Sequence, residues 1–249
     1  GTSLNLPPTT TTTPTTDLLQ SNPAAQALAE ATGLQPADFS SGWQSVTNNA
    51  TSADTTIDHQ FYSCLGLAQD PLQFRDGDAF SKVFTSTASP LGFPKVYSEA
   101  SVFTSAKYPA QILAADESAK LPNCAIQELQ AQQGTLPQGE TASNFVATLL
   151  PNPLPGSRNA VAYQVQFQLY VSAAAQAAQS ATLNSNGGES INTSKYKPFT
   201  EEVYGQVEVI TAGKEAVFIN VQDVGSPVPN SQLATWASDV NNHLRQQGV

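Results

Sequence analysis

Residues Val161–Val171 read VAYQVQFQLYV, and this stretch decides the fold of the chain. Apolar side chains occupy every second position, and glutamines occupy most of the positions between them. Successive side chains of a β-strand point to opposite faces, so the pattern predicts a strand with one buried face and one wet or half-covered face. Such strands are typical of antiparallel sheets, because strands of parallel sheets are buried on both faces.

Further strand-like runs lie on both sides of this one in the sequence. Residues 145–150 are expected to pair with it, and residues 201–211 and 216–221 to form a hairpin. Two earlier runs, 79–87 and 95–104, are separated by the turn sequence Ser-Pro-Leu-Gly-Phe-Pro. Together these runs predict a central antiparallel β-sheet.

Helical periodicity marks the segments that flank this sheet. In the last of them, Leu233, Trp236, Val240 and Leu244 make one apolar stripe. The sequence therefore predicts an α+β fold with a central antiparallel β-sheet flanked by helices. The predicted helices span residues 23–32, 54–67, 108–118, 122–133 and 231–247.

The chain divides into a linker and a single domain. Residues 1–23 are rich in Thr and Pro and are expected to form a disordered spacer, and residues 24–249 are expected to form one exported α+β domain. Residues 173–197 of this domain are rich in Ala, Gln, Ser and Asn and are expected to be a flexible insertion. Because such spacers are typical of anchored proteins, we expect an N-terminal transmembrane helix or lipid that is not present in this chain. The alternative is a purely secreted protein.

Charged residues are sparse, and acidic ones predominate. The chain has 10 Lys and Arg against 20 Asp and Glu, for a net charge of −10. A surface of this sign repels the phosphates of nucleic acids and of anionic lipids, so we expect no nucleic-acid partner. The low charged fraction and the abundance of uncharged polar residues indicate an extracytoplasmic location, in the periplasm or cell envelope.

The chain has two cysteines, Cys64 and Cys124. Cys64 falls on the same predicted helix face as Ile57, Phe61 and Leu65, which suits a buried disulfide. A disulfide would also suit an oxidising compartment. The alternative is a pair of buried thiols. Neither cysteine belongs to a C-x-x-C motif, which disfavours thioredoxin chemistry and zinc ribbons.

Catalytic motifs are missing from the sequence. The only histidines, His59 and His243, lie on predicted helices with no partner apparent from spacing, and no G-x-S-x-G nucleophile elbow occurs. The P-loop and dinucleotide-binding fingerprints do not occur either, so no cofactor is expected. We therefore expect a protein that is not an enzyme. The alternative is a hydrolase with a dispersed site.

The acidic residues Asp70, Asp76 and Asp78 form the one cluster with the composition of a calcium site. The sequence Arg-Asp-Gly-Asp at 75–78 is, however, typical of a turn before a strand, and we favour the turn. No metal site is predicted.

Four aromatic side chains are candidates for a binding surface. Tyr97 and Phe103 lie opposite the apolar face of their predicted strand, and Tyr170 and Tyr204 do so on theirs. If helices cover only one face of the sheet, these side chains would line the other, as a surface for an apolar ligand. The alternative is a second helical layer that buries them.

Short motifs in the chain resemble exported actinobacterial cell-envelope domains. The first group is LQPADFSSGWQSV (34–46), FYSCLGL (61–67), VYSEASVFTSAKYPAQIL (96–113) and LPNCAIQEL (121–129). The second group, EAVFINVQDVG (215–225) and LATWASDVNNHL (233–244), is similar to the end of PsbP/Mog1-like lipoproteins and of kinase-sensor ectodomains. The resemblance implies an antiparallel sheet flanked by helices and a role in ligand sensing or envelope lipid transport. It brings no catalytic residues.

Three functions are compatible with these observations. The first is a non-catalytic, membrane-tethered adaptor or binding domain in cell-envelope biogenesis, with a membrane or envelope protein such as a lipid or glycolipid transporter as its partner. The second is a sensor ectodomain that binds a small apolar or glycan ligand. The third is the hydrolase with a dispersed site. In each case we expect a monomer.

Overall fold

A computed structural model describes residues 22–50, 59–183 and 193–249 of the chain. The predicted linker lies outside these residues except for its last two positions, as do the start of the predicted helix 54–67 and part of the predicted insertion 173–197. The strands are β1 (Trp43–Val46), β2 (Arg75–Phe80), β3 (Val83–Ser86), β4 (Lys95–Phe103), β5 (Glu140–Leu149), β6 (Ala160–Val171), β7 (Phe199–Ala212) and β8 (Glu215–Val224). The helices are α1 (Pro23–Thr32), α2 (His59–Cys64), α3 (Lys107–Asp116), α4 (Leu121–Ala131), α5 (Ala173–Leu183) and α6 (Asn230–Gln246), with short 3₁₀ turns η1 (Pro36–Asp38), η2 (Pro71–Phe74), η3 (Gln132–Thr135) and η4 (Thr193–Lys195).

The strands form one antiparallel sheet in the order β1-β3-β4-β8-β7-β6-β5, and β2 pairs with β4 beside β3. The predicted fold class is confirmed. Strand β6 lies between β5 and β7, and its odd-numbered side chains from Val161 to Val171 are all buried. The even-numbered glutamines at 164, 166 and 168 are partly exposed, as the alternation predicts.

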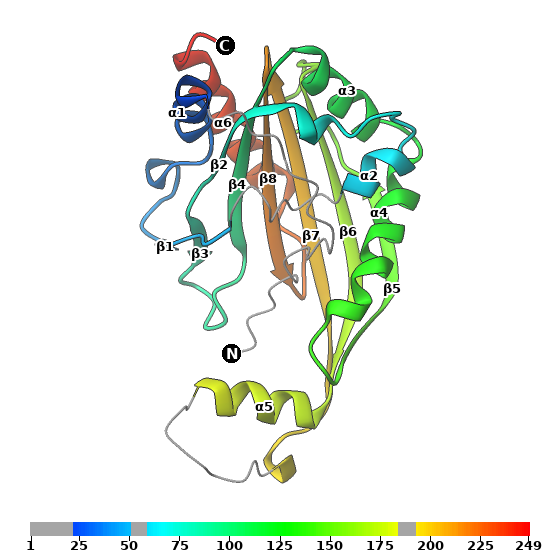
Figure 1. Cartoon of the computed structure of the whole chain (residues 1–249). Coiled ribbons are helices and arrows are strands. Elements are labelled where there is room, and N and C mark those ends of the chain that lie inside the picture. Colours follow the sequence, from blue (N-terminus) through cyan, green and yellow to red (C-terminus); the bar gives the residue numbers. More distant parts are fainter. Residues whose placement is uncertain (1–21, 51–58, 184–192) are drawn as a thin grey trace.

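Both faces of the sheet carry helices, as Figure 1 shows. We call the face to which Val161, Tyr163 and Val165 point the α4 face, because these residues share a buried cluster with α2, α3 and α4. The opposite face, to which Ala160 and Ile210 point, is the α6 face, since it packs against α1 and α6. Helix α5 lies apart from the two helical layers (Figure 1).

The single strand predicted at residues 79–87 is wrong, because the structure has two strands there. Strand β2 begins earlier, at Arg75, and a break at Ser81 and Lys82 separates it from β3. The backbone N–H of Ser81 donates to the Ser98 carbonyl at the break, so both short strands share one edge of β4. The predicted turn at 75–78 is therefore also wrong, since these residues belong to β2, where Arg75, Gly77 and Asp78 pair with β4 and Asp76 lies at a bulge.

Gly77 explains why this sequence is a strand and not a turn. A Cβ atom at Gly77 would lie 2.5 Å from the backbone carbonyl carbon of Ala25 in α1, which is closer than real Cβ atoms approach a backbone. The glycine thus lets α1 pack directly on β2. This contact joins residues that are far apart in the sequence, so the Asp-Gly-Asp sequence alone does not reveal it and predicts a turn.

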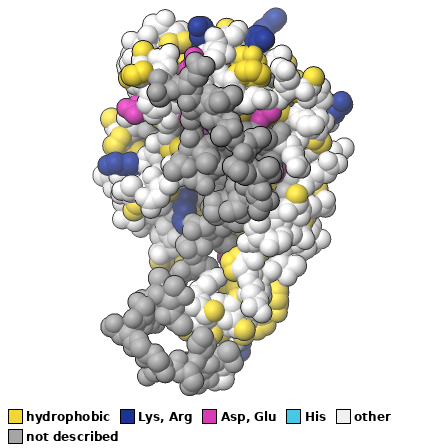
Figure 2. All heavy atoms as spheres, in the orientation of Figure 1, with side chains coloured by type: hydrophobic (Ala, Val, Ile, Leu, Met, Phe, Trp, Pro, Cys, Tyr) yellow, Lys and Arg dark blue, Asp and Glu magenta, His cyan; other side chains and the backbone are white. Residues whose placement is uncertain are grey.

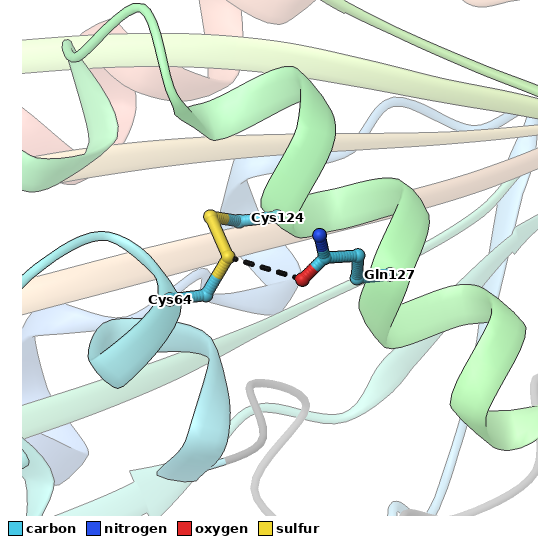
Figure 3. Close-up of a disulfide and its surroundings, with 3 residues drawn as sticks. All are labelled: Cys64, Cys124 and Gln127. Carbon is cyan, nitrogen blue, oxygen red and sulfur yellow. Dashed lines mark hydrogen bonds between the residues drawn. A yellow bond between two sulfur atoms is a disulfide. The ribbon is translucent and has the colours of Figure 1, made fainter.

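Cys64 and Cys124 form a disulfide that joins α2 to α4, with 5.7 Å between their Cα atoms. Figure 3 shows the Gln127 amide beside it, 3.4 Å from the Cys64 sulfur. A disulfide sulfur has no proton to donate, so this contact is not a hydrogen bond from Cys64. The disulfide holds Phe61 and Tyr62 of α2 in the core, where both are buried.

Among the described helices, not one combines the length and the apolar character that a membrane crossing requires. Figure 2 shows Lys and Arg side chains scattered over the visible face, with no basic patch among the atoms that it colours.

Candidate functional site

The helical layer on the α6 face stops partway along β6 and β7. Gln206 marks the limit: its side-chain amide donates to the Val228 carbonyl and accepts the Val228 N–H, each over 3.0 Å. Val228 lies in the loop that leads from β8 into α6. Beyond Gln206 the side chains of this face are partly exposed, which leaves one end of the sheet accessible.

The accessible end carries a row of amides, one carboxylate and two tyrosines that all point to the α6 face. We call this set the amide strip. It is supplied by β6 and β7, whose regular antiparallel register places Gln166 beside Tyr204 and Gln168 beside Glu202. Its members are Gln164, Gln166, Gln168, Tyr170, Glu202 and Tyr204.

Hydrogen bonds hold the polar groups of the amide strip in place. Gln166 Nε2 donates to one carboxylate oxygen of Glu202 over 3.0 Å, and Gln168 Nε2 donates to the other over 2.8 Å. Asn144 Nδ2 on β5 donates in turn to Gln168 Oε1 over 2.6 Å. These bonds lower the pKa of Glu202 below its usual value, so the carboxylate is ionised at neutral pH.

The two tyrosines stand at the ends of this network. Tyr170 is 43% exposed and Tyr204 is partly exposed, so each ring offers an accessible apolar surface with a hydroxyl at its edge. Tyrosines expose large, rigid faces at a small cost in conformational entropy. Each glutamine of the strip also keeps hydrogen-bonding capacity beyond the bonds of this network, because an amide has two donors and two acceptor lone pairs.

The four aromatics predicted as one surface do not form one. Phe103 is fully buried in the cluster of the α4 face, so it is not a surface residue. Tyr97 pairs with Asn220, which pairs with Val207 of the same cluster, so Tyr97 faces α4 and not α6. Of the four, Tyr170 and Tyr204 share the accessible part of the α6 face. The difference arises because the two pairs come from different strands, whose relative faces depend on the register of the whole sheet.

The amides and Glu202 were not predicted as site residues. The alternation of glutamines in β6 indicates only that they face solvent. Their assembly into a site depends on Glu202, which comes from β7 beyond helix α5, and on the pairing of Gln168 with it. A row of three glutamines on one strand face is the one sequence signal from which part of the site could have been found.

Two of the three acidic residues considered as a calcium site, Asp70 and Asp78, serve structural roles. Asp78 accepts a hydrogen bond from the Ser101 hydroxyl over 2.7 Å and lies 3.4 Å from Arg75, which also binds Glu99 over 3.1 Å. Asp70 accepts the Leu72 N–H and caps η2. Across the described residues, no group of three or more Asp, Glu, His or Cys side chains is arranged to hold a metal ion.

The two histidines considered from the sequence, His59 and His243, lie in different helices. His59 begins α2, and its side chain lies outside the part of the structure that is described. His243 on α6 contacts the Gly33 carbonyl and the Asp38 carboxylate, which places it in the packing of α6 against the segment after α1.

Two shallow hollows also open on the described surface. One of about 190 Å³ lies between the end of α1 and the β2–β3 break, beside Gly33 and Ser81. The other, of about 440 Å³, lies between residues 153–159 and α6, beside Asn241 and Arg245. Neither gathers several buried polar groups around one point, as a specific ligand pocket does.

Comparisons with known proteins add a limited likeness. No family model and no curated protein matches the chain. Its structure is similar to that of the extracellular domain of PknH from Mycobacterium tuberculosis, with a TM-score of 0.37 and 12% sequence identity, over 88% of this chain and 97% of that one. At this level of similarity, function has to be inferred from the chain's own residues. The resemblance to PsbP/Mog1-like and lipoprotein domains stays a prediction.

Proposed function

We propose that this protein is an exported, non-catalytic domain that binds a glycan on the amide strip. One observation carries the proposal: an accessible, pre-ordered row of amides around Glu202, with the rings of Tyr170 and Tyr204 beside it. The strip presents many neutral donors and acceptors in a row on one face of the sheet, which suits the hydroxyl groups of a sugar chain.

The chemistry of the strip favours a glycan over an apolar ligand. An apolar ligand would have to strip water from the glutamines and from the Glu202 carboxylate without replacing their hydrogen bonds, which is costly. Sugar hydroxyls replace these bonds, and the apolar face of a sugar ring fits a tyrosine ring. The ionised Glu202 also disfavours an anionic ligand such as a phosphorylated glycolipid.

Two properties support an exported location. The Cys64–Cys124 disulfide persists in oxidising compartments and is rare in the cytosol. The surface is polar but poor in charge, as Figure 2 shows for one face. Attachment to the membrane through the Thr/Pro-rich linker, and a place in the cell envelope, remain parts of the proposal.

The adaptor function has its own observation in its favour. Strand β5 is an edge of the sheet, and Val146 and Leu149 on it are 50% and 41% exposed. An exposed edge strand with apolar side chains is a common contact for a protein partner. A lipid transporter as that partner remains a proposal, and charged substitutions at Val146 that abolish co-purification with it would support this second function.

The glycan proposal is tested on an array of neutral and acidic glycans. The wild-type domain is compared with the double variant Tyr170→Ala/Tyr204→Ala and with Tyr97→Ala, a matched control on the opposite face. We expect binding to neutral glycans that the double variant weakens at least about tenfold, as for central aromatic contacts in other interfaces. Equal binding by the double variant and the wild type would contradict the proposal, as would binding to none of the glycans.

A further inference from the structure

Two buried carboxyl groups lie beneath the helices of the α6 face. Glu208 on β7 is fully buried between Ala162 and Ile219, and Ile219 belongs to the same cluster as Trp236 of α6. Neither carboxylate oxygen of Glu208 has a hydrogen-bond partner among the described residues. Burial alone holds the pKa of Glu208 well above its usual range, and no charged group of the described chain opposes this.

Glu215 is the second buried carboxyl group, and it lies beneath the end of α1. It begins β8, pairs with Val102 and Ala212, and is fully buried. Burial raises its pKa to about 7, and the nearby Thr32 hydroxyl partly opposes the rise. The Thr32 proton itself is donated to the Leu28 carbonyl over 3.1 Å, which leaves the Glu215 carboxyl without a donor in good geometry among the described residues.

A histidine connects the two helices at the rim of the same interface. His243 Nδ1 lies 3.0 Å from the Gly33 carbonyl oxygen, and His243 Nε2 lies 3.3 Å from Asp38 Oδ1. Both neighbours are acceptors, and a neutral imidazole has only one N–H. One further charged group faces the imidazole, Asp239 on α6 itself.

We propose that α1 and α6 dock on the sheet in a proton-dependent way, tightly at acidic pH and more loosely as the pH rises past neutrality. Protonation of Glu208 and Glu215 removes their buried charges, and deprotonation places two unpaired charges beneath the helices. His243 joins the two helices at the rim of this interface through Gly33 and Asp38. The inference rests on the packing of α1 and α6 and does not depend on what the amide strip binds.

The sign of the pH dependence follows from a comparison of the docked state with the detached state. Once α1 and α6 detach, the two glutamates meet water and ionise near their ordinary pKa values, whereas in the docked state they stay neutral to higher pH. Docking is therefore fully favourable below the ordinary pKa of a glutamate. The contribution of Glu215 to docking weakens as the pH rises toward about 7, which is its pKa in the docked state. Above that pH this contribution stays constant.

The test is hydrogen–deuterium exchange of the 249-residue chain at pH 5 and pH 8, with protection corrected for the intrinsic pH dependence of exchange. Amides of 230–246 should lose at least about tenfold in protection at pH 8, because each unit of pKa shift is a factor of ten. Amides of 161–171 should lose less. In Glu215→Gln, a neutral side chain of the same shape, the loss should shrink markedly while protection at pH 5 is unchanged. Glu117→Gln, at an exposed glutamate after α3, is the matched control and should behave as wild type.

His243→Gln provides an independent arm with little risk to folding. It removes the contacts that join α6 to Gly33 and Asp38, so it should lower the protection of α6 at both pH values and leave in place the pH dependence that Glu208 and Glu215 carry. Equal α6 protection at both pH values in the wild type would overturn the proposal. So would a pH dependence that Glu215→Gln leaves intact.

Discussion

Gln206 holds Val228 through a pair of 3.0 Å hydrogen bonds, one to its N–H and one to its carbonyl. The Gln206 side chain thus pairs with the backbone of the loop before α6 in the way that a neighbouring strand would. Gln206 also donates to Gln164 of the amide strip over 3.3 Å. This one amide therefore separates the covered part of the α6 face from the accessible part.

Replacing Gln206 with Ala should destabilise the fold by about 2 kcal/mol, because it leaves two buried backbone groups without partners. Urea unfolding followed by circular dichroism measures the change. Gln111→Ala, at an exposed glutamine of α3, is the control and should stay within about 0.5 kcal/mol of wild type. A Gln206→Ala variant as stable as this control would show that the two bonds to Val228 contribute nothing.

Gly77→Ala should cost at least about 2 kcal/mol, because the added methyl group meets the backbone of Ala25, which cannot rotate away. The same substitution at Gly134 meets no atom within 4 Å and is the matched control. Thermal unfolding of both variants tests the point. If the two melt alike, α1 does not pack on β2 as closely as the structure shows.

Replacing both cysteines, in Cys64→Ala/Cys124→Ala, should lower the stability by about 4 kcal/mol, from the loop entropy that a crosslink over 60 residues removes from the unfolded chain. The sheet should persist in the circular dichroism spectrum, while exchange of the α2 amides should rise first. Free thiols in protein recovered under non-reducing conditions from its own compartment would argue against both the disulfide and the exported location.

Asp116 offers a prediction about pH on the other face. It ends α3 fully buried, and neither carboxylate oxygen has a partner among the described residues. Burial, with the charge of Glu128, raises its pKa well above the usual value. The contribution of Asp116 to the free energy of unfolding is therefore greatest while the carboxyl of the unfolded chain is still protonated, near pH 3 to 4. It falls as the pH rises above that.

The variant Asp116→Asn keeps the shape of the protonated acid and cannot ionise. It should match the wild type near pH 3.5 and be more stable at pH 7. Urea midpoints at the two pH values give the comparison, and Asp223→Asn, at a half-buried acid of β8, is a control expected to change less. A wild type that is more stable than Asp116→Asn at pH 7 would mean that the carboxylate is ionised and paired.

The strands with strict alternation were predictable because their pattern is local. In β6 each odd residue is buried, its pairing with β5 was expected from the run at 145–150, and β7 and β8 were expected as a hairpin. The break between β2 and β3 was not predictable, since Gly77 is a strand residue only because α1 lies against it. The pairing of Cys64 with Cys124 could be predicted, because a chain with two cysteines allows a single intramolecular disulfide.

The candidate site shows the same division between local and distant information. All four aromatics were correctly placed opposite the apolar residues of their strands, but Tyr97 and Phe103 lie toward α4, whereas Tyr170 and Tyr204 lie on the α6 face. One strand reveals which side chains share its face, but not which face of the sheet that is. Glu202 needed the register of β6 against β7, which places it beside Gln168.

The most direct test of the glycan proposal is a titration of the ¹⁵N-labelled domain with neutral hexasaccharides, followed through the side-chain amide signals. We predict that the signals of Gln164, Gln166 and Gln168 move with at least one sugar, while that of Gln111 on α3 does not. Signals of the strip that stay still with every hexasaccharide, or shifts confined to residues away from it, would contradict the claim.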